Sequence, residues 1–223
     1  MKALPRPPSG VFFDLDGTLL DSAPGLHVAL QSYCRELRVP APAYAGVRKV
    51  VSRGARAVLR TAFPQADDEA LRALAPRYLD IYAGVMGAHT HAFDGVEALL
   101  AALQAAGIPW GVVTNKPAFL TDPLLAQLGL AARAAAVVSG DTLAQRKPDP
   151  APVLHACALA GVDAATAVFV GDDLRDVQAG HAAGLYTVAA AWGYLDGGDP
   201  HGWDADAVAD DPRQLLRRLA LPA

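Results

Sequence analysis

Helical and short apolar segments alternate along most of this chain, and this alternation constrains its fold more than any other feature. The first apolar run is Val11-Phe12-Phe13, and regular pairs of a helix and a strand begin near residue 93. The predicted helices cover 95–106, 118–128, 150–160, 174–183 and 211–219, and the predicted strands cover 108–114, 135–138, 166–170, 186–190 and 207–209. Such alternation is typical of an α/β fold, a doubly wound parallel sheet that binds its ligands beyond the carboxyl ends of the strands.

The segment between the first strand and residue 92 shows helical spacing and no clear strand signal. Residues 22–38 carry apolar residues on one helical face, with Ser22 or Asp21 as the N-cap. Residues 43–88 repeat apolar residues at helical intervals. We therefore expect a small all-helical domain over residues 21–91, inserted into a core formed by residues 1–20 and 92–223.

Composition narrows the function classes. With 223 residues and 52% hydrophobic content, the chain can bury a sizeable core. The net charge of -4 provides no basic stripe for nucleic acid, and the apolar stretches are too short to cross a bilayer. The first eight residues contain no apolar export signal, so the expected location is cytoplasmic. The expected partner is a small molecule, and the oligomeric state is unknown from the sequence.

The two cysteines, one histidine pair and one Gly- and Asp-rich segment show no pattern that indicates a functional site. Cys34 and Cys157 lie in no C-x-x-C pattern and are predicted to be buried free thiols. His89 and His91 lack a third ligand nearby, which argues against a metal site there. Residues 191–206 are rich in Gly and Asp and are predicted to form a surface loop.

The first strand ends in two carboxylates, Asp14 and Asp16, followed by Gly17 and Thr18. Residues two apart on a strand share a face, so both carboxylates face the crevice beyond the sheet. Like charges this close require a cation, a shared proton or a cationic neighbour. The alternative is an ordinary polar turn, in which Asp, Gly and Thr are all common.

Three later strands also end in polar residues. Thr114-Asn115-Lys116 follows one strand, Lys147 stands before Pro148 at a later turn, and Asp172, Asp173 and Asp176 follow another strand. Each segment has a structural alternative, namely a helix cap, a solvated lysine or an acidic first helical turn. Because the carboxyl ends of parallel strands meet at one edge, the four segments together favour a single functional crevice.

In this order the segments Asp-Leu-Asp-Gly-Thr, Thr-Asn-Lys, Lys-Pro-Asp-Pro and Gly-Asp-Asp-Leu-Arg-Asp resemble the four motifs of the haloacid dehalogenase superfamily. The resemblance covers nearly the whole chain and includes the helical insertion of the type called a C1 cap. It implies a Rossmann-like core, and within the superfamily the chain looks most similar to bacterial phosphoglycolate phosphatases and N-acetylmuramic acid 6-phosphate phosphatases.

The resemblance implies a role for each motif. Asp14 would be the nucleophile that forms an aspartyl-phosphate, and Asp16 would exchange protons with the leaving alcohol and the attacking water. Thr114 and Asn115 would bind the phosphoryl group, and Lys147 would neutralise charge on it.

The resemblance also implies Mg2+ as the cofactor. The ion would be held by Asp14, the backbone carbonyl of Asp16, and Asp172, with Asp173 or Asp176 acting directly or through water.

The inserted helices would select the substrate. Arg53 and Arg56 flank Gly54 and offer an anion clamp for a substrate carboxylate, although a solvated helix face is an equal alternative. The implied function is a phosphomonoesterase for a small carboxylated phosphate ester. The alternatives are a sugar phosphomutase of the same superfamily and, from another class, a phosphate-accepting signalling module; dehalogenation has no need of Asp16.

Overall fold

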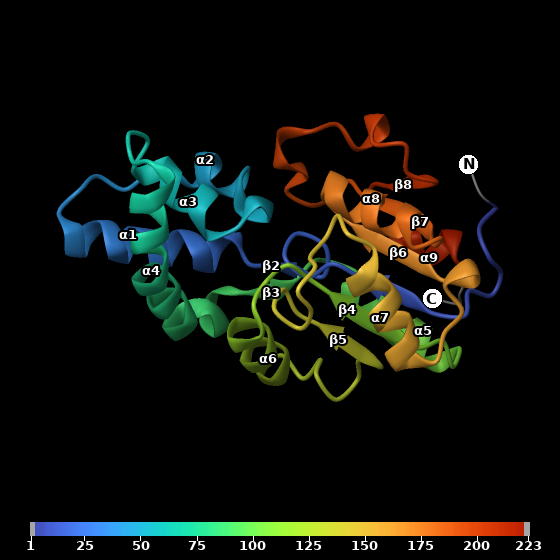
Figure 1. Cartoon of the computed structure of the whole chain (residues 1–223). Coiled ribbons are helices and arrows are strands. Elements are labelled where there is room, and N and C mark those ends of the chain that lie inside the picture. The colour runs from blue at the N-terminus through green and yellow to red at the C-terminus, as the bar shows by residue number, and fades with distance from the viewer. Residues whose placement is uncertain (1–2, 221–223) are drawn as a thin grey trace.

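Six parallel strands form the central sheet of the computed structural model, which describes residues 3–220 (Figure 1). Their order is β5-β4-β1-β6-β7-β8, so the first strand lies in the interior of the sheet. The strands are β1 (Val11–Phe13), β4 (Trp110–Val113), β5 (Ala136–Val138), β6 (Val168–Gly171), β7 (Tyr186–Ala190) and β8 (Ala207–Ala209). Phe13 pairs with Val112 on one side and with Val170 on the other, which aligns the carboxyl ends of β1, β4 and β6.

Helices cover both faces of this sheet, as expected for a doubly wound α/β fold. They are α5 (Val96–Ala105), α6 (Ala118–Gln127), α7 (Ala151–Ala160), α8 (Leu174–Ala182) and α9 (Pro212–Arg218). Successive side chains of β1 alternate between the two faces: Phe12 packs into the core beneath α7 and α8, whereas Val11 and Phe13 pack into the larger core that includes α5 and α9. The predicted fold class is confirmed.

The segment before α5 is helical, as its spacing predicts. It contains α1 (Ala23–Leu37), α2 (Tyr44–Arg48), the short 3-10 helix η1 (Val51–Arg53), α3 (Ala55–Ala62) and α4 (Asp68–His89). These helices lie together beyond one end of the sheet (Figure 1), and α1 packs along α4. The chain enters and leaves the group through a short antiparallel pair, β2 (Leu20–Asp21) and β3 (His91–Ala92).

The predicted elements of the sheet region are confirmed within a few residues, but the prediction of a simple surface loop over 191–206 is wrong. This segment contains two 3-10 helices, η3 (Leu195–Gly197) and η4 (Pro200–Gly202), and its first part is buried against the core. Tyr194 is 4% exposed, and its hydroxyl accepts hydrogen bonds from the backbone of Ser22 and Ala23. Cys34 and Cys157 are free and buried, as predicted.

Candidate active site

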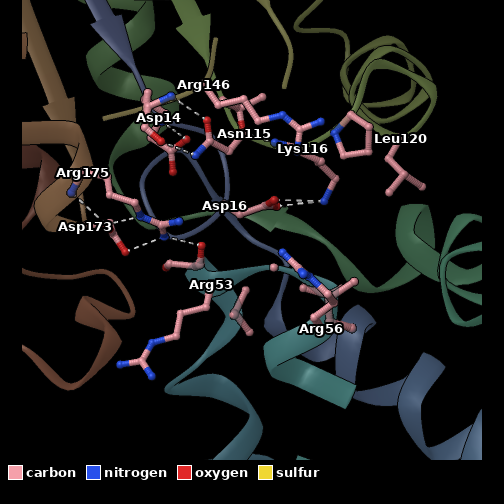
Figure 2. Close-up of a pocket in the computed structure, with 18 of the residues that line it drawn as sticks. Asp14, Asp16, Arg53, Arg56, Asn115, Lys116, Leu120, Arg146, Asp173 and Arg175 are labelled. Atoms are coloured by element: carbon pink, nitrogen blue, oxygen red, sulfur yellow. Dashed lines mark hydrogen bonds and ion pairs between the residues drawn. The ribbon is translucent and has the colours of Figure 1, made fainter. Parts of the chain in front are cut away.

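The polar strand ends line one pocket of about 480 Å³, situated between the sheet and the inserted helices (Figure 2). Asp14 follows β1, and its backbone N–H donates to Val170 of β6. Thr114 follows β4 in the same way, with its N–H donating to Val138 of β5. The parallel register therefore carries side chains from distant motifs into one cavity.

Lys147 joins two of the buried carboxylates. Its Nζ lies 2.6 Å from Asp14 Oδ1 and 2.7 Å from Asp176 Oδ1, and the lysine side chain is 3% exposed. Burial alone would lower the pKa of Lys147, but the two carboxylates outweigh burial and raise it. Lys147 is therefore a permanent positive charge between Asp14 and Asp176.

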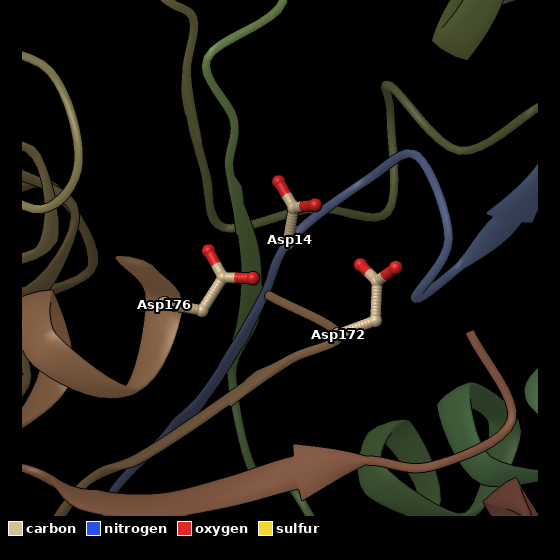
Figure 3. A group of neighbouring side chains, drawn as sticks. All are labelled: Asp14, Asp172 and Asp176. Carbon is tan, nitrogen blue, oxygen red and sulfur yellow. The ribbon is translucent and has the colours of Figure 1, made fainter. Parts of the chain in front are cut away.

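Asp14, Asp172 and Asp176 form a compact acidic cluster, with one oxygen from each lying within 4.8 Å of the others. Figure 3 shows the three carboxylates facing a common space at the ends of β1 and β6 and the start of α8. Burial, followed by the charges of Asp14 and Asp176, raises the pKa of Asp172 well above its usual range. A bound cation would relieve this unfavourable concentration of negative charge.

Asp172 has only neutral donors among residues 3–220. Its carboxylate accepts hydrogen bonds from the Thr18 hydroxyl at 3.1 Å, the Ser52 hydroxyl at 3.2 Å and the Tyr194 backbone N–H at 2.9 Å. A fully buried carboxylate without a cationic partner is costly. The residues present thus fit a hard divalent cation, which prefers carboxylate oxygens and retains several waters.

Asp16 lies outside this cluster and forms an ion pair with Lys116, a residue for which the motifs predict no role. Lys116 Nζ donates to the two Asp16 oxygens at 3.1 and 3.0 Å and to the Tyr82 hydroxyl of α4 at 3.0 Å. Burial opposes the charge of Lys116, but Asp16 and Tyr82 together raise the pKa of the lysine. One buried ammonium group therefore connects Asp16 to the inserted helices.

Thr114 and Asn115 both line the pocket but differ in their contacts. The Thr114 hydroxyl accepts from the backbone N–H of Lys116 at 3.1 Å, which leaves its own proton available to an anion. The Asn115 side chain donates to the Lys147 carbonyl at 3.0 Å and accepts from the Lys147 N–H at 3.1 Å. Asn115 thus holds the backbone from which Lys147 reaches Asp14.

Asp173 is turned away from the acidic cluster and caps α8. The Asp173 carboxylate accepts a hydrogen bond from the Arg175 N–H at 2.9 Å, and the Asp173 N–H donates to the Asp176 carboxylate. Asp173 and Asp176 together form a capping box at the start of α8. Its carboxylate also pairs with the Arg175 guanidinium at 2.8 Å. Burial opposes ionisation, but the Arg175 hydrogen bonds lower the pKa of Asp173.

Arg53 and Arg56, the two arginines predicted to clamp an anion, are directed differently although both line the pocket. Arg53 forms an ion pair with Asp196 of η3, whereas Arg56, in the first turn of α3, forms no ion pair within residues 3–220. Figure 2 shows the Arg53 guanidinium pointing away from Asp16 and the Arg56 side chain reaching into the cavity. The sequence spacing alone does not distinguish these two positions.

Three residues of the site have no predicted role: Lys116, Ser52 and Tyr194. Lys116 belongs to the Thr-Asn-Lys segment at a strand end, but the motif does not show that it binds Asp16. Ser52 lies in the predicted helical segment 43–88 and Tyr194 in the Gly- and Asp-rich segment 191–206, and each contacts Asp172 across more than twenty positions of sequence.

Comparisons with known proteins agree with this geometry. Residues 11–190 match the model of the haloacid dehalogenase-like hydrolase family. The chain is 47% identical to a phosphoglycolate phosphatase of Xanthomonas campestris pv. campestris (strain 8004), with 97% of this chain and 99% of that protein covered. It is 42% identical to an N-acetylmuramic acid 6-phosphate phosphatase of Pseudomonas putida, with 93% and 94% covered.

A solved structure also resembles the chain closely. The crystal structure of a predicted phosphoglycolate phosphatase from Haemophilus somnus superimposes with a TM-score of 0.84 at 27% identity, covering 94% of this chain and 96% of that one. The fold, the site and these similarities define a phosphatase. The chain belongs to the haloacid dehalogenase-like hydrolases, which confirms the resemblance found in the motifs.

No helix within residues 3–220 is long and apolar enough to span a membrane.

Proposed function

We propose that the chain is a Mg2+-dependent phosphomonoesterase that hydrolyses a small carboxylated phosphate ester through an aspartyl-phosphate on Asp14. The observation that carries the proposal is the position of Asp14, which lies at the end of an interior strand, 2.6 Å from Lys147 and within the acidic cluster. A carboxylate held there can attack phosphorus while Lys147 offsets charge on the transferring group.

The first step forms a bond between an Asp14 oxygen and phosphorus and breaks the bond between phosphorus and the ester oxygen. Asp16 delivers a proton to the departing alcohol, so the alcohol leaves neutral. In the second step Asp16 takes a proton from water, the water oxygen attacks phosphorus, and Asp14 is released as a carboxylate. Thr114 supplies a hydroxyl donor to the phosphoryl oxygens, since its oxygen already accepts from the Lys116 N–H.

The carboxylates of Asp14, Asp172 and Asp176 would hold the metal, and the family resemblance implies that the Asp16 backbone carbonyl would add a fourth oxygen. When bound, Mg2+ supplies charge neutralisation and orientation to the phosphoryl group. The Asp173 carboxylate, held by Arg175, supports the metal site through α8 instead of contacting the ion.

The substrate class rests on the pocket and on the relatives. Proteins named phosphoglycolate phosphatase and N-acetylmuramic acid 6-phosphate phosphatase resemble the chain, and both names specify a phosphate ester that carries a carboxylate. A cavity of about 480 Å³ lies within the range of roughly 300–1,000 Å³ that holds drug-sized ligands, and part of its wall is apolar. This volume accommodates the larger ester as well as the two-carbon one.

The test compares phosphate release from 2-phosphoglycolate and from N-acetylmuramic acid 6-phosphate, with and without a chelator. We expect free phosphate from at least one ester and its loss when the metal is removed. The Asp14→Asn variant should remain folded and lose turnover by at least about three orders of magnitude. Near-normal activity of that variant would exclude the covalent mechanism, and isomer formation without phosphate release would identify a phosphomutase.

A further inference from the structure

The pocket contains more positive than negative side chains. Six cationic and four acidic residues line it: Arg53, Arg56, Lys116, Arg146, Lys147 and Arg175, with Asp14, Asp16, Asp173 and Asp176. A dianionic phosphoryl group near Asp14 balances this excess of two charges, so the net charge alone does not call for a second anion. The position of the cations that pair with no carboxylate of the protein indicates where a second anionic group of the substrate can bind.

Four of the six cations already have carboxylate partners. Lys116 pairs with Asp16, and Lys147 pairs with Asp14 and Asp176. The other two cations in ion pairs are Arg175, which pairs with Asp173, and Arg53, which pairs with Asp196. These four cations hold the protein's own acids in place.

Arg56 and Arg146 are the two pocket cations that form no ion pair within residues 3–220. Arg146 directly precedes Lys147 and belongs to the phosphate side of the pocket. Arg56 belongs to the opposite wall, on α3, and Figure 2 shows it reaching into the cavity across from Asp14. An ester bound with its phosphorus at Asp14 therefore directs its alcohol portion toward Arg56.

A turn of the backbone at Gly54 lies between Arg53 and Arg56, whose side chains point in different directions. Gly54 has φ of +82°, a conformation that side chains other than glycine rarely adopt, and it ends η1 before α3 begins. Before this turn Arg53 pairs with Asp196, and after it Arg56 forms no ion pair within residues 3–220 and lines the pocket. Val51 and Ala55 also line this part of the pocket, and Arg56 is exposed, so its guanidinium is accessible to a bound anion.

We propose that Arg56 binds the carboxylate of the substrate and thereby selects carboxylated phosphate esters, while Arg53 only fastens η1 to η3. A planar guanidinium binds a carboxylate through two parallel hydrogen bonds, which a neutral amide cannot match. This inference rests on the proposed function and assigns one residue to its substrate specificity.

The experiment uses two pairs of esters that differ only in the charge of one group: 2-phosphoglycolate with its carboxamide, and N-acetylmuramic acid 6-phosphate with the carboxamide of its lactyl group. The readout is the ratio of kcat/KM for the acid to kcat/KM for the amide. Arg56→Gln is compared with Arg53→Gln and Arg146→Gln, and the melting temperature of each variant verifies folding.

In the wild type we expect a ratio of about tenfold to a hundredfold in favour of the acid for at least one pair. Arg56→Gln should reduce that ratio to about one, mainly through KM, while Arg53→Gln and Arg146→Gln should preserve it. An unchanged ratio in Arg56→Gln, or a loss of the ratio in Arg146→Gln alone, would overturn the assignment of Arg56.

Failure of the proposed function gives a different result. If the wild type hydrolyses acid and amide equally well, the carboxylated substrate class is wrong although the chain remains a phosphatase. If it hydrolyses none of the four esters, both the proposed substrate class and the role of Arg56 are rejected.

Discussion

Asp172 is enclosed by two glycines, and neither position leaves room for a side chain. A Cβ on Gly17 would lie 2.2 Å from Asp172 Oδ2, and the φ of +94° at Gly17 disfavours any other residue. A Cβ on Gly193 would lie 2.2 Å from Asp172 Cβ and 2.5 Å from the Gly17 carbonyl oxygen. The position of the Asp172 carboxylate in the acidic cluster therefore depends on both close approaches.

We predict that Gly193→Ala weakens metal binding although residue 193 contributes no carboxylate. The added methyl group must displace Asp172 from Asp14 and Asp176, so the Mg2+ concentration for half-maximal activity should rise by at least about tenfold. The matched control is Gly202→Ala in the same segment, where a Cβ meets nothing within 4 Å. Equal metal affinity in the two variants, measured by calorimetric titration, would contradict this account of the Asp172 position.

The site residues that the sequence reveals are those placed by local structure. Asp14, Thr114 and Asp172 each follow an apolar strand, and the parallel sheet alone predicts that they meet. The residues that form hydrogen bonds and ion pairs with these side chains could not be predicted in this way. Ser52 meets Asp172 across 120 positions, and this contact depends on how the inserted helices pack, which no local pattern encodes. Lys116 and Asp16 follow the paired strands β4 and β1, but no local pattern shows that the lysine pairs with Asp16 rather than with Asp14.

At the level of single elements, α8 begins with a capping box that occupies two acids of the fourth motif. Asp173 accepts from the Arg175 N–H, while Asp176 accepts from the Asp173 N–H and also contacts Lys147. The same helix start therefore fixes the direction of Asp176 toward the acidic cluster. Motif position alone does not separate the roles of these two acids.

Substitution of Asp173 separates a capping role from metal contact. Asp173→Asn retains a side-chain acceptor and should leave Mg2+ affinity within about twofold of the wild type, whereas Asp173→Ala should lower the free energy of unfolding by about 1 kcal/mol. Chemical denaturation measures the stability change, and metal titration measures the affinity. A large loss of affinity in Asp173→Asn would place its carboxylate on the ion after all.

The elements themselves are predicted well wherever apolar periodicity is regular, as in α1 and β6. The segment 191–206 is the exception, because its Gly and Asp content indicates only turns. Its structure comes from tertiary contacts instead: the Trp192 indole donates to the Thr18 carbonyl at 3.0 Å, and the Tyr194 hydroxyl donates to Asp21 at 2.8 Å.

Across the whole molecule, the inserted helices are joined to the sheet region around the pocket. Arg175 donates to the Ser52 carbonyl at 2.6 Å, and the Arg48 guanidinium lies 5.0 Å from the centre of the Tyr194 ring. Together with the Lys116 contact to Tyr82, these interactions connect the inserted helices to the sheet region beside the pocket.

The stability of the whole molecule should depend jointly on pH and Mg2+. Burial, reinforced by Asp14 and opposed by Lys147, raises the pKa of Asp176 to about 7 in the metal-free protein. The folded state therefore retains a proton that the unfolded chain releases near its ordinary pKa of about 4. The contribution of Asp176 to metal-free stability is thus present at the acidic end of this window and is lost as pH rises through about 7.

Mg2+ requires the carboxylate form, so its stabilising effect should increase over the same window. At about a hundredfold excess over Kd, near pH 7.5, we expect the melting temperature to rise by about 5–10 °C, corresponding to about 2.7 kcal/mol. Near pH 5.5, at the same Mg2+ concentration, the rise should be clearly smaller. Calorimetric melting at the two pH values provides the measurement, and an equal rise at both would show that these carboxylates do not control metal binding.

In the proposed reaction Asp14 receives the phosphoryl group during turnover. The most direct measurement is borohydride trapping during steady-state hydrolysis with Mg2+, followed by peptide mass spectrometry, because borohydride reduces an acyl phosphate and leaves free carboxylates unchanged. We predict reduction at residue 14 only, dependent on substrate and absent from Asp14→Asn. Reduction at another acid, or active turnover with no reduced peptide, would contradict the proposed reaction.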